Sequence, residues 1–134
     1  MNNLIPLKVR LLAASFHAIN VLFPVFSIFS VIIIWILWTF TRNIHPFVDL
    51  AGRNAFNCAI NNLLWLMVGL TLCFSLFSLT CGIGSQDPGP VMLGLAFTSF
   101  LALAYVIYAL VAGIYALTGS NFKSRLIYPF LQDE

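Results

Sequence analysis

Three long uncharged stretches alternate with short polar segments along the chain. They cover residues 11–41, 54–86 and 88–122, and each is longer than the ~20 residues that cross the hydrocarbon of a bilayer as a helix. The segment VIIIWILW at 31–38 shows no alternation of polar and apolar positions, which a transmembrane β-strand would require. The pattern therefore predicts membrane-spanning α-helices.

The second and third stretches each predict one long helix. The helix of the second stretch extends over residues 46–81, with its membrane part from about residue 55. It ends in the Gly/Pro-rich turn CGIGSQDPGP at 81–90. The other extends over residues 91–118 and stops at Gly119, a candidate C-cap.

The stretch at 11–41 contains Pro24 and allows two interpretations. As a helix it supplies ~47 Å, too long for one upright crossing and too short for two. A hairpin of short helices at 8–22 and 24–41 would place all the basic residues on one side of the membrane, whereas a single kinked span would divide them four against two. The basic residues are Lys8, Arg10, Arg42, Arg53, Lys123 and Arg125. The positive-inside rule favours the hairpin, which predicts a four-helix bundle with both termini cytoplasmic or stromal; three spans remain the alternative.

Composition supports the same class of protein and excludes others. The chain is 61% hydrophobic and 7% charged, whereas a soluble domain has about a quarter of its residues charged. We expect one all-α integral membrane domain over residues 1–134.

No acidic residue lies inside a predicted span, which excludes carboxylate proton relays and carboxylate metal sites there. The few bases fit membrane orientation and predict no nucleic-acid binding, and no catalytic motif predicts an enzyme.

One dense polar patch, NIHPFVDLAGRNAFN at 43–57, interrupts the apolar runs. Pro46 suits the first position of a helix, where its missing N–H is not needed, and His45 before it suits a capping or interfacial role. Asp49 follows in the opening turn, and Arg53 is spaced i,i+4 from it, so the two side chains can pair. We expect this pair to contribute little if it is exposed to water.

Three asparagines form a stripe that descends from the patch into the predicted span. Asn54, Asn57 and Asn61 follow steps of three and four, which places them along one helix face. Amides facing lipid are costly, so they should face other helices or a watery cleft. Hydrogen bonding between helices is favoured over a polar lining for a substrate path.

The last predicted helix carries a seam of small residues. Ala102, Ala109 and Ala116 repeat at seven, with Tyr105 and Ala112 between them. Such a seam is typical of close helix packing in membranes. The Tyr105 hydroxyl would lie near mid-membrane and need a hydrogen-bond partner.

His17 is the one weak candidate for a cofactor ligand. A histidine in a membrane helix can bind the metal of haem or chlorophyll, but a buried, hydrogen-bonded histidine is the favoured interpretation. No cofactor is predicted.

The polar patch resembles the signature of a known family. HPFVDLAGRNAFN is similar to the central motif of a widespread family of small bacterial membrane proteins with an uncharacterised domain, related to the twenty-kilodalton subunit of the chloroplast inner-envelope protein translocon. FHAI at 16–19 and GSNFKSRLIYP at 119–129 resemble two further segments of that family. The resemblance implies a four-helix membrane fold and marks His45, Pro46, Phe47, Asp49, Arg53, Ala55, Asn57, Tyr128 and Pro129. Cys58 stands where that family usually has an aromatic residue.

Two classes of function follow from these patterns. The favoured one is a non-catalytic accessory or assembly subunit, packed against larger integral membrane proteins in a hetero-oligomeric complex or against itself. The other, implied by the resemblance, is a component of a protein-conducting translocon, although four short helices do not easily enclose a pore. A pigment- or lipid-binding subunit is a third alternative. The expected location is a bacterial inner membrane, a thylakoid or a plastid envelope.

Overall fold

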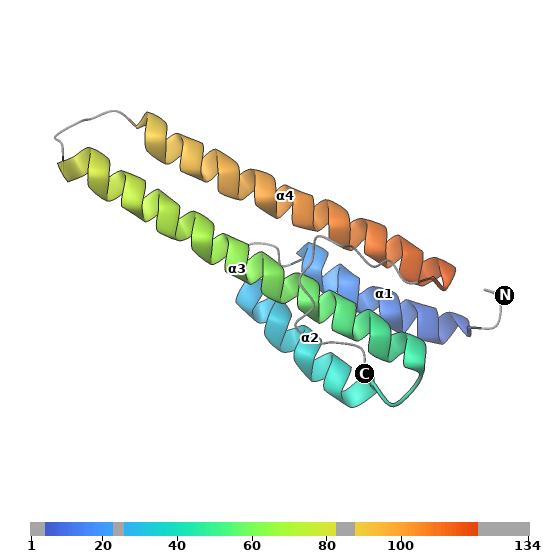
Figure 1. Cartoon of the computed structure of the whole chain (residues 1–134). Helices are drawn as coiled ribbons and strands as arrows, with labels where there is room; N and C mark the ends of the chain where they lie inside the picture. Colours follow the sequence, from blue (N-terminus) through green and yellow to red (C-terminus); the bar gives the residue numbers. More distant parts are fainter. Residues whose placement is uncertain (1–4, 23–25, 83–87, 121–134) are drawn as a thin grey trace.

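A computed structural model of the chain describes residues 5–22, 26–82 and 88–120. They form four helices, α1 (Leu7–Leu22), α2 (Ser27–Thr41), α3 (Pro46–Gly82) and α4 (Gly89–Thr118), and the described residues contain no strand (Figure 1). The prediction of an all-helical chain with four helices is confirmed. Two of the helices, α3 over Pro46–Leu79 and α4, are long and apolar enough to cross a membrane.

Local sequence sets the ends of the long helices. Pro46 is the first residue of α3, and the Nδ1 of His45 accepts a hydrogen bond from the Phe47 backbone N–H at 3.1 Å. That bond satisfies a donor that the first turn of a helix leaves unpaired. At the other terminus, Gly119 adopts a left-handed conformation with φ 80° and donates its N–H to the carbonyls of Ala116 and Tyr115. A residue without a Cβ takes this conformation at no steric cost.

The inner ends of α1 and α2 both contact the first half of α3. Asn20 near the end of α1 donates from Nδ2 to the Ala55 carbonyl at 3.0 Å. Asn62 of α3 donates from Nδ2 to the Ser27 hydroxyl, the first residue of α2, at 2.7 Å. Since Ala55 and Asn62 lie two turns apart on α3, α1 and α2 form an antiparallel pair that covers the first part of α3 (Figure 1).

The outer ends of all four helices gather at one end of the molecule. There α2 contacts α3 through Trp38 and Asp49, and Arg10 of α1 donates to the Leu117 carbonyl of α4 at 3.2 Å. Four of the six basic residues are described, and all four lie at or near this end: Lys8, Arg10, Arg42 and Arg53. We call it the basic end. Lys123 and Arg125 lie outside the described residues.

The two helix pairs differ in length. At 1.5 Å per residue, α1 and α2 extend about 24 and 22 Å, against about 55 Å for α3 and 45 Å for α4. The α1–α2 pair therefore covers only the half of α3 and α4 next to the basic end. We call the uncovered part, residues 63–82 and 89–104, the distal segment.

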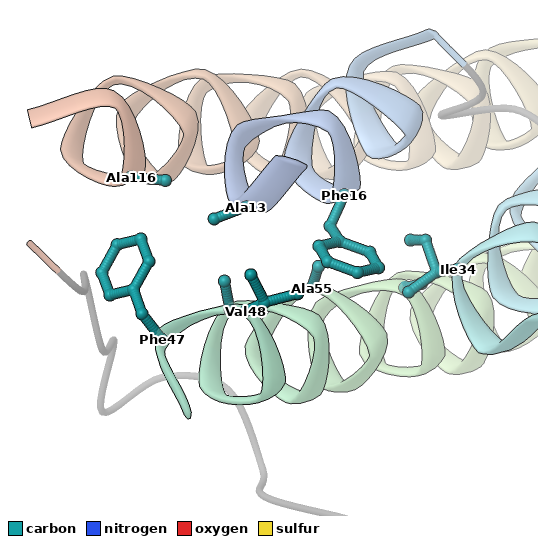
Figure 2. Packing of buried hydrophobic residues seen from close by; sticks show 9 residues of the cluster. Ala13, Phe16, Ile34, Phe47, Val48, Ala55 and Ala116 are labelled. Atoms are coloured by element: carbon teal, nitrogen blue, oxygen red, sulfur yellow. The ribbon is translucent and has the colours of Figure 1, made fainter. Parts of the chain in front are cut away.

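The core next to the basic end is built from small side chains. Ala51, Ala55 and Ala59 form a buried i,i+4 stripe on α3 and belong to one cluster with Phe16 of α1. Figure 2 shows Ala55 next to the Phe16 ring. Ala13, Ile34, Phe47, Val48 and Ala116 complete this cluster, so every helix contributes to it. Small residues allow helix backbones to approach closely, and this approach rather than side-chain volume brings the four helices together here.

The predicted small-residue seam of α4 faces inward. Ala109, Ala112 and Ala116 are fully buried, whereas Ala102 and Tyr105 are half-buried. The seam runs along α1 and α3, the two helices on which α4 packs. It therefore serves packing within this chain.

The distal segment is held by a reciprocal contact between glycines and small side chains. Gly69 of α3 lies against Thr98 of α4, and Gly94 of α4 lies against Cys73 of α3. A Cβ on Gly94 would lie 2.7 Å from the Cys73 sulfur, and one on Gly69 would overlap the Thr98 methyl group. Each glycine thus faces the side chain four residues after the other glycine. Here α3 and α4 lie close together without contacts from α1 or α2.

Candidate functional site

Part of the polar patch lines an open cavity at the turn between α2 and α3. The cavity has a volume of about 270 Å³ and is lined by Trp38, Arg42, Asn43, Asp49 and Arg53. We call it the arginine pocket. Arg42 and Asn43 at its rim are exposed, so the pocket opens to the outside at the basic end.

One face of α3 holds the Trp38 side chain of α2. The indole Nε1 donates to Asp49 Oδ1 at 2.7 Å, and the ring stacks on Phe56 with a centroid separation of 6.5 Å and an interplanar angle of 28°. Between these residues, a Cβ on Gly52 would overlap the indole ring. Asp49, Gly52 and Phe56 lie on adjacent turns of one face of α3. Asp49 accepts the indole hydrogen bond, Gly52 leaves room for the ring, and Phe56 stacks on it.

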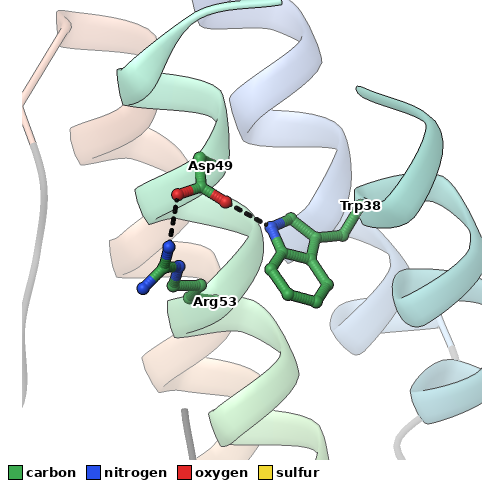
Figure 3. A network of polar contacts seen from close by, with 3 residues as sticks. All are labelled: Trp38, Asp49 and Arg53. Atoms are coloured by element: carbon green, nitrogen blue, oxygen red, sulfur yellow. Dashed lines mark hydrogen bonds and ion pairs between the residues drawn. The ribbon is translucent and has the colours of Figure 1, made fainter. Parts of the chain in front are cut away.

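Asp49 is the polar centre of the pocket. Its second oxygen, Oδ2, lies 2.9 Å from Arg53 Nη2, so the carboxylate contacts both the tryptophan of α2 and the arginine one turn along α3 (Figure 3). About a quarter of each side chain of the ion pair is exposed. With both of its oxygens engaged, the carboxylate organises the wall of the pocket and its charge is balanced.

Arg42 also lines the pocket. Its guanidinium carbon lies 5.8 Å from the centroid of the Trp38 ring, within the range of a cation–π contact. Within the described residues the Arg42 guanidinium takes part in no ion pair or hydrogen bond. Two guanidinium groups and one carboxylate leave the arginine pocket with a net charge of +1.

The structure places the predicted asparagine stripe inside the helix assembly. Asn57 and Asn61 are buried and Asn54 is half-buried, with Asn61 donating from Nδ2 to the Asn57 carbonyl at 2.8 Å. Asn62 and Asn20 make side-chain hydrogen bonds between helices. Sequence reasoning did not single out Asn62, although its position next to Asn61 shows that α3 carries amides on two adjacent faces at this level.

His17 is buried between α1 and α4. A Cβ on Gly113 would lie 3.5 Å from the His17 Cβ, so the two helices lie close together at this level. A planar tetrapyrrole on this histidine would have to separate them. The prediction that His17 binds no cofactor stays untested, with haem or chlorophyll ligation as its weak alternative. Within the described ranges, no group of three or more His, Cys, Asp or Glu side chains is placed to hold a metal ion.

Other residues of the polar patch form the start of α3 or pack in the core beside it. His45 and Pro46 form the helix start, and Phe47 is buried in the core. Tyr128 and Pro129, which the resemblance also marks, lie outside the described residues.

A second hollow of about 700 Å³ lies along the distal segment. It is bordered by Asn61 and by apolar side chains of α3, with one hydroxyl among them: Leu64, Trp65, Met67, Val68, Thr71 and Leu72. Its surface is almost wholly apolar, in contrast to the arginine pocket.

Comparison with known proteins corrects the resemblance to the translocon-related family. No curated protein and no solved structure matches this chain, and the family model that matches is a different one, so the assignment to relatives of the chloroplast translocon subunit is wrong. The match extends over residues 8–131, which is most of the sequence and includes all four helices. The chain belongs to the magnetosome magnetite crystal formation protein family, MamF/MmsF.

Proposed function

We propose that this chain is a multi-pass protein of the magnetosome membrane that acts in magnetite crystal formation as a non-catalytic accessory subunit. The observation that carries the proposal is the family match over residues 8–131. The apolar surface of the two long helices supports the membrane location. Other integral membrane proteins of the same membrane are the expected partners.

The surface of α3 and α4 is suited to lipid. Only 11% of the most apolar window of α3 and 17% of that of α4 are buried within the chain, whereas the core helix of a soluble protein would be mostly buried. Phe74 and Leu93, on the two helices of the distal segment, are 70% and 73% exposed. Apolar surface in water costs about 25 cal/mol per Å², and a bilayer removes that cost.

The basic end supports an orientation in that membrane. Lys8, Arg10, Arg42 and Arg53 lie at or near one end of the helices, and Pro88 before α4 lies at the other. Positively charged ends of membrane helices usually stay on the cytoplasmic side. We therefore expect the basic end in the cytoplasm and the turn between α3 and α4 on the opposite side.

The interior supports a packing role over a conducting one. The core next to the basic end is filled by alanines, Phe16 and Ile34. The buried amides Asn20 and Asn62 hold helices to one another. Polar groups used in this way stabilise an assembly, as expected of an accessory subunit.

Two measurements test the proposal in the host cell. A tagged full-length chain should remain with purified magnetosomes after a carbonate wash and dissolve only in detergent. Cells lacking the chain should form magnetite crystals of altered size, shape or number by electron microscopy, and expression of the intact chain should restore them. Recovery of the tagged chain in the soluble fraction would refute the membrane location, and unaltered crystals would refute the role in crystal formation.

A further inference from the structure

The arginine pocket has the features of an anion site. Its wall contains two guanidinium groups and its single carboxylate is already engaged by Trp38 and Arg53 at 2.7 and 2.9 Å. Among the described residues that line the pocket, an incoming anion therefore meets a net positive charge and no unpaired carboxylate. A volume of about 270 Å³ accommodates a tetrahedral oxyanion with part of its substituent.

The Arg42 guanidinium lies beside a tryptophan that the fold holds in place. Its carbon is 5.8 Å from the centroid of the Trp38 ring, and Trp38 is fixed by its bond to Asp49 and its stacking on Phe56. A planar guanidinium presents its donors as a fork, the geometry that suits two oxygens of one phosphate. Arg53, paired with Asp49, supplies the second positive charge.

The position of the pocket limits the source of the anion. It lies beside the first turns of α3. In the membrane orientation proposed above, on which the lipid source rests, Trp38 marks the interface as aromatic side chains usually do. Phospholipid phosphates lie at that level, and anionic leaflets attract basic groups. We infer that the arginine pocket binds an anionic phosphate group through Arg42 and Arg53, presented by a phospholipid headgroup or as free phosphate.

The test uses the pocket's own tryptophan as the reporter. The chain contains three tryptophans, and replacing Trp35 and Trp65 with Phe leaves Trp38 as the one emitter. The full-length protein in nonionic detergent is titrated with phosphatidylglycerol, with phosphatidylcholine or with inorganic phosphate, and lipids that stay bound are counted by native mass spectrometry. The inorganic phosphate arm does not depend on membrane location, so its outcome is independent of the proposed function.

Arg42→Gln is the main variant, and Lys8→Gln is its matched control. Both remove one exposed positive charge near the basic end, but Lys8 does not line the pocket. Because a charge-assisted hydrogen bond is lost, Arg42→Gln should raise the half-saturating concentration of phosphatidylglycerol by about tenfold, and Lys8→Gln should leave it almost unchanged. Arg42→Lys should fall between them, since lysine keeps the charge but lacks the planar fork.

The titrations distinguish a lipid headgroup from free phosphate as the ligand, and a specific site from general electrostatic attraction. Tighter binding of phosphatidylglycerol than of inorganic phosphate assigns the site to a lipid headgroup, and equal or tighter binding of inorganic phosphate assigns it to the soluble ion. Equal losses in Arg42→Gln and Lys8→Gln would mean general electrostatic attraction and would overturn the site, as would no response of Trp38 to either ligand. Circular dichroism and elution volume check that each variant keeps its helices.

Discussion

The inward-facing seam of α4 predicts that Ala109→Leu destabilises the protein itself. Ala109 has no exposed surface, and its neighbours on the seam, Ala112 and Ala116, are equally enclosed between α4 and the helices it packs on. Leucine adds three carbon atoms at a position with no free space. The added side chain must therefore push α4 away from α1 or α3, which separates contacts along the whole seam.

The cost can be estimated from overpacking in other cores. Forcing additional carbons into a packed site costs about 1–3 kcal/mol, which lowers the folding equilibrium constant by roughly 5- to 150-fold. Ala104→Leu is the matched control, because Ala104 is exposed on the same helix and receives the same added volume. Lipid or detergent is as apolar as leucine, so the control should cost close to nothing.

The assay is reversible unfolding in mixed micelles of a mild detergent and increasing dodecyl sulfate, followed by circular dichroism. We expect the midpoint for Ala109→Leu to shift to lower dodecyl sulfate, while the midpoint for Ala104→Leu stays at that of the wild type. Equal midpoints for the two variants would refute an inward seam. A smaller complex with an unchanged unfolding midpoint would also refute it, because the seam would then face a partner.

Three further outcomes test other parts of the structure. Gly69→Ala should destabilise the distal segment, because Thr98 can yield only by breaking its hydroxyl bond to a backbone carbonyl; the double variant Gly69→Ala/Thr98→Ala should recover most of the loss in the same unfolding assay, and no recovery would contradict the contact. Asn62→Leu should cost about 0.6–1.7 kcal/mol, the range for hydrogen bonds between membrane helices, and a stability equal to wild type would show that the bond to α2 contributes nothing. In a cysteine-free background, Asn43→Cys should react with a membrane-impermeant maleimide from the cytoplasmic side only and Pro88→Cys from the opposite side only; labelling of both from one side would contradict the proposed orientation.

Helix number and helix ends could be predicted because they depend on local chemistry. Pro46 lacks the N–H that would extend the helix backward, and Gly119 accepts the left-handed conformation that ends one, so each position has the same meaning in any fold. The break between α1 and α2 followed from length and charge, since one span would have been too long and would have divided the basic residues. These rules need no knowledge of which helix contacts which.

The pairing of helices could not be predicted because small residues occur on several faces. The alanine seam of α4 was visible in the sequence, but the Ala51–Ala55–Ala59 stripe and the contact between Gly69 and Thr98 were not singled out. Alanine and glycine at i,i+4 are common in apolar helices, and only the register of two helices shows which of them face each other.

The arginine pocket was missed for a similar reason. Asp49 and Arg53 could be paired from their spacing, and we expected the pair to contribute little if it was exposed to water. Trp38 precedes Asp49 by 11 residues, across the turn at 42–45, and nothing in the local pattern shows that its indole bonds to that carboxylate. The pair therefore has a third member on another helix, which gives the carboxylate a role in holding α2 against α3.

The incorrect family assignment also has a physical explanation. The motif HPFVDLAGRNAFN contains a helix start at Pro46, a core residue at Phe47, and a face that receives Trp38 at Asp49 and Gly52. Each of these features helps a short helix turn back against a longer one at a membrane surface, whatever the protein does. The motif therefore reflects the local helix arrangement. Two proteins that share it are more strongly expected to share a fold than a function.

The molecule has two parts that differ in how their helices are held together and in what their surfaces expose. Next to the basic end, four helices enclose alanines and amides, and the polar patch ties α2 to α3 through Trp38 and Asp49, while Arg42 is exposed. In the distal segment, two helices are joined by glycine contacts, and their large apolar side chains are exposed. Substitutions near the basic end should therefore alter the anion site or the fold without changing how the long helices meet lipid. Substitutions on the exposed face of the distal segment should act through lipid or through a partner, which makes the two parts separable by mutation.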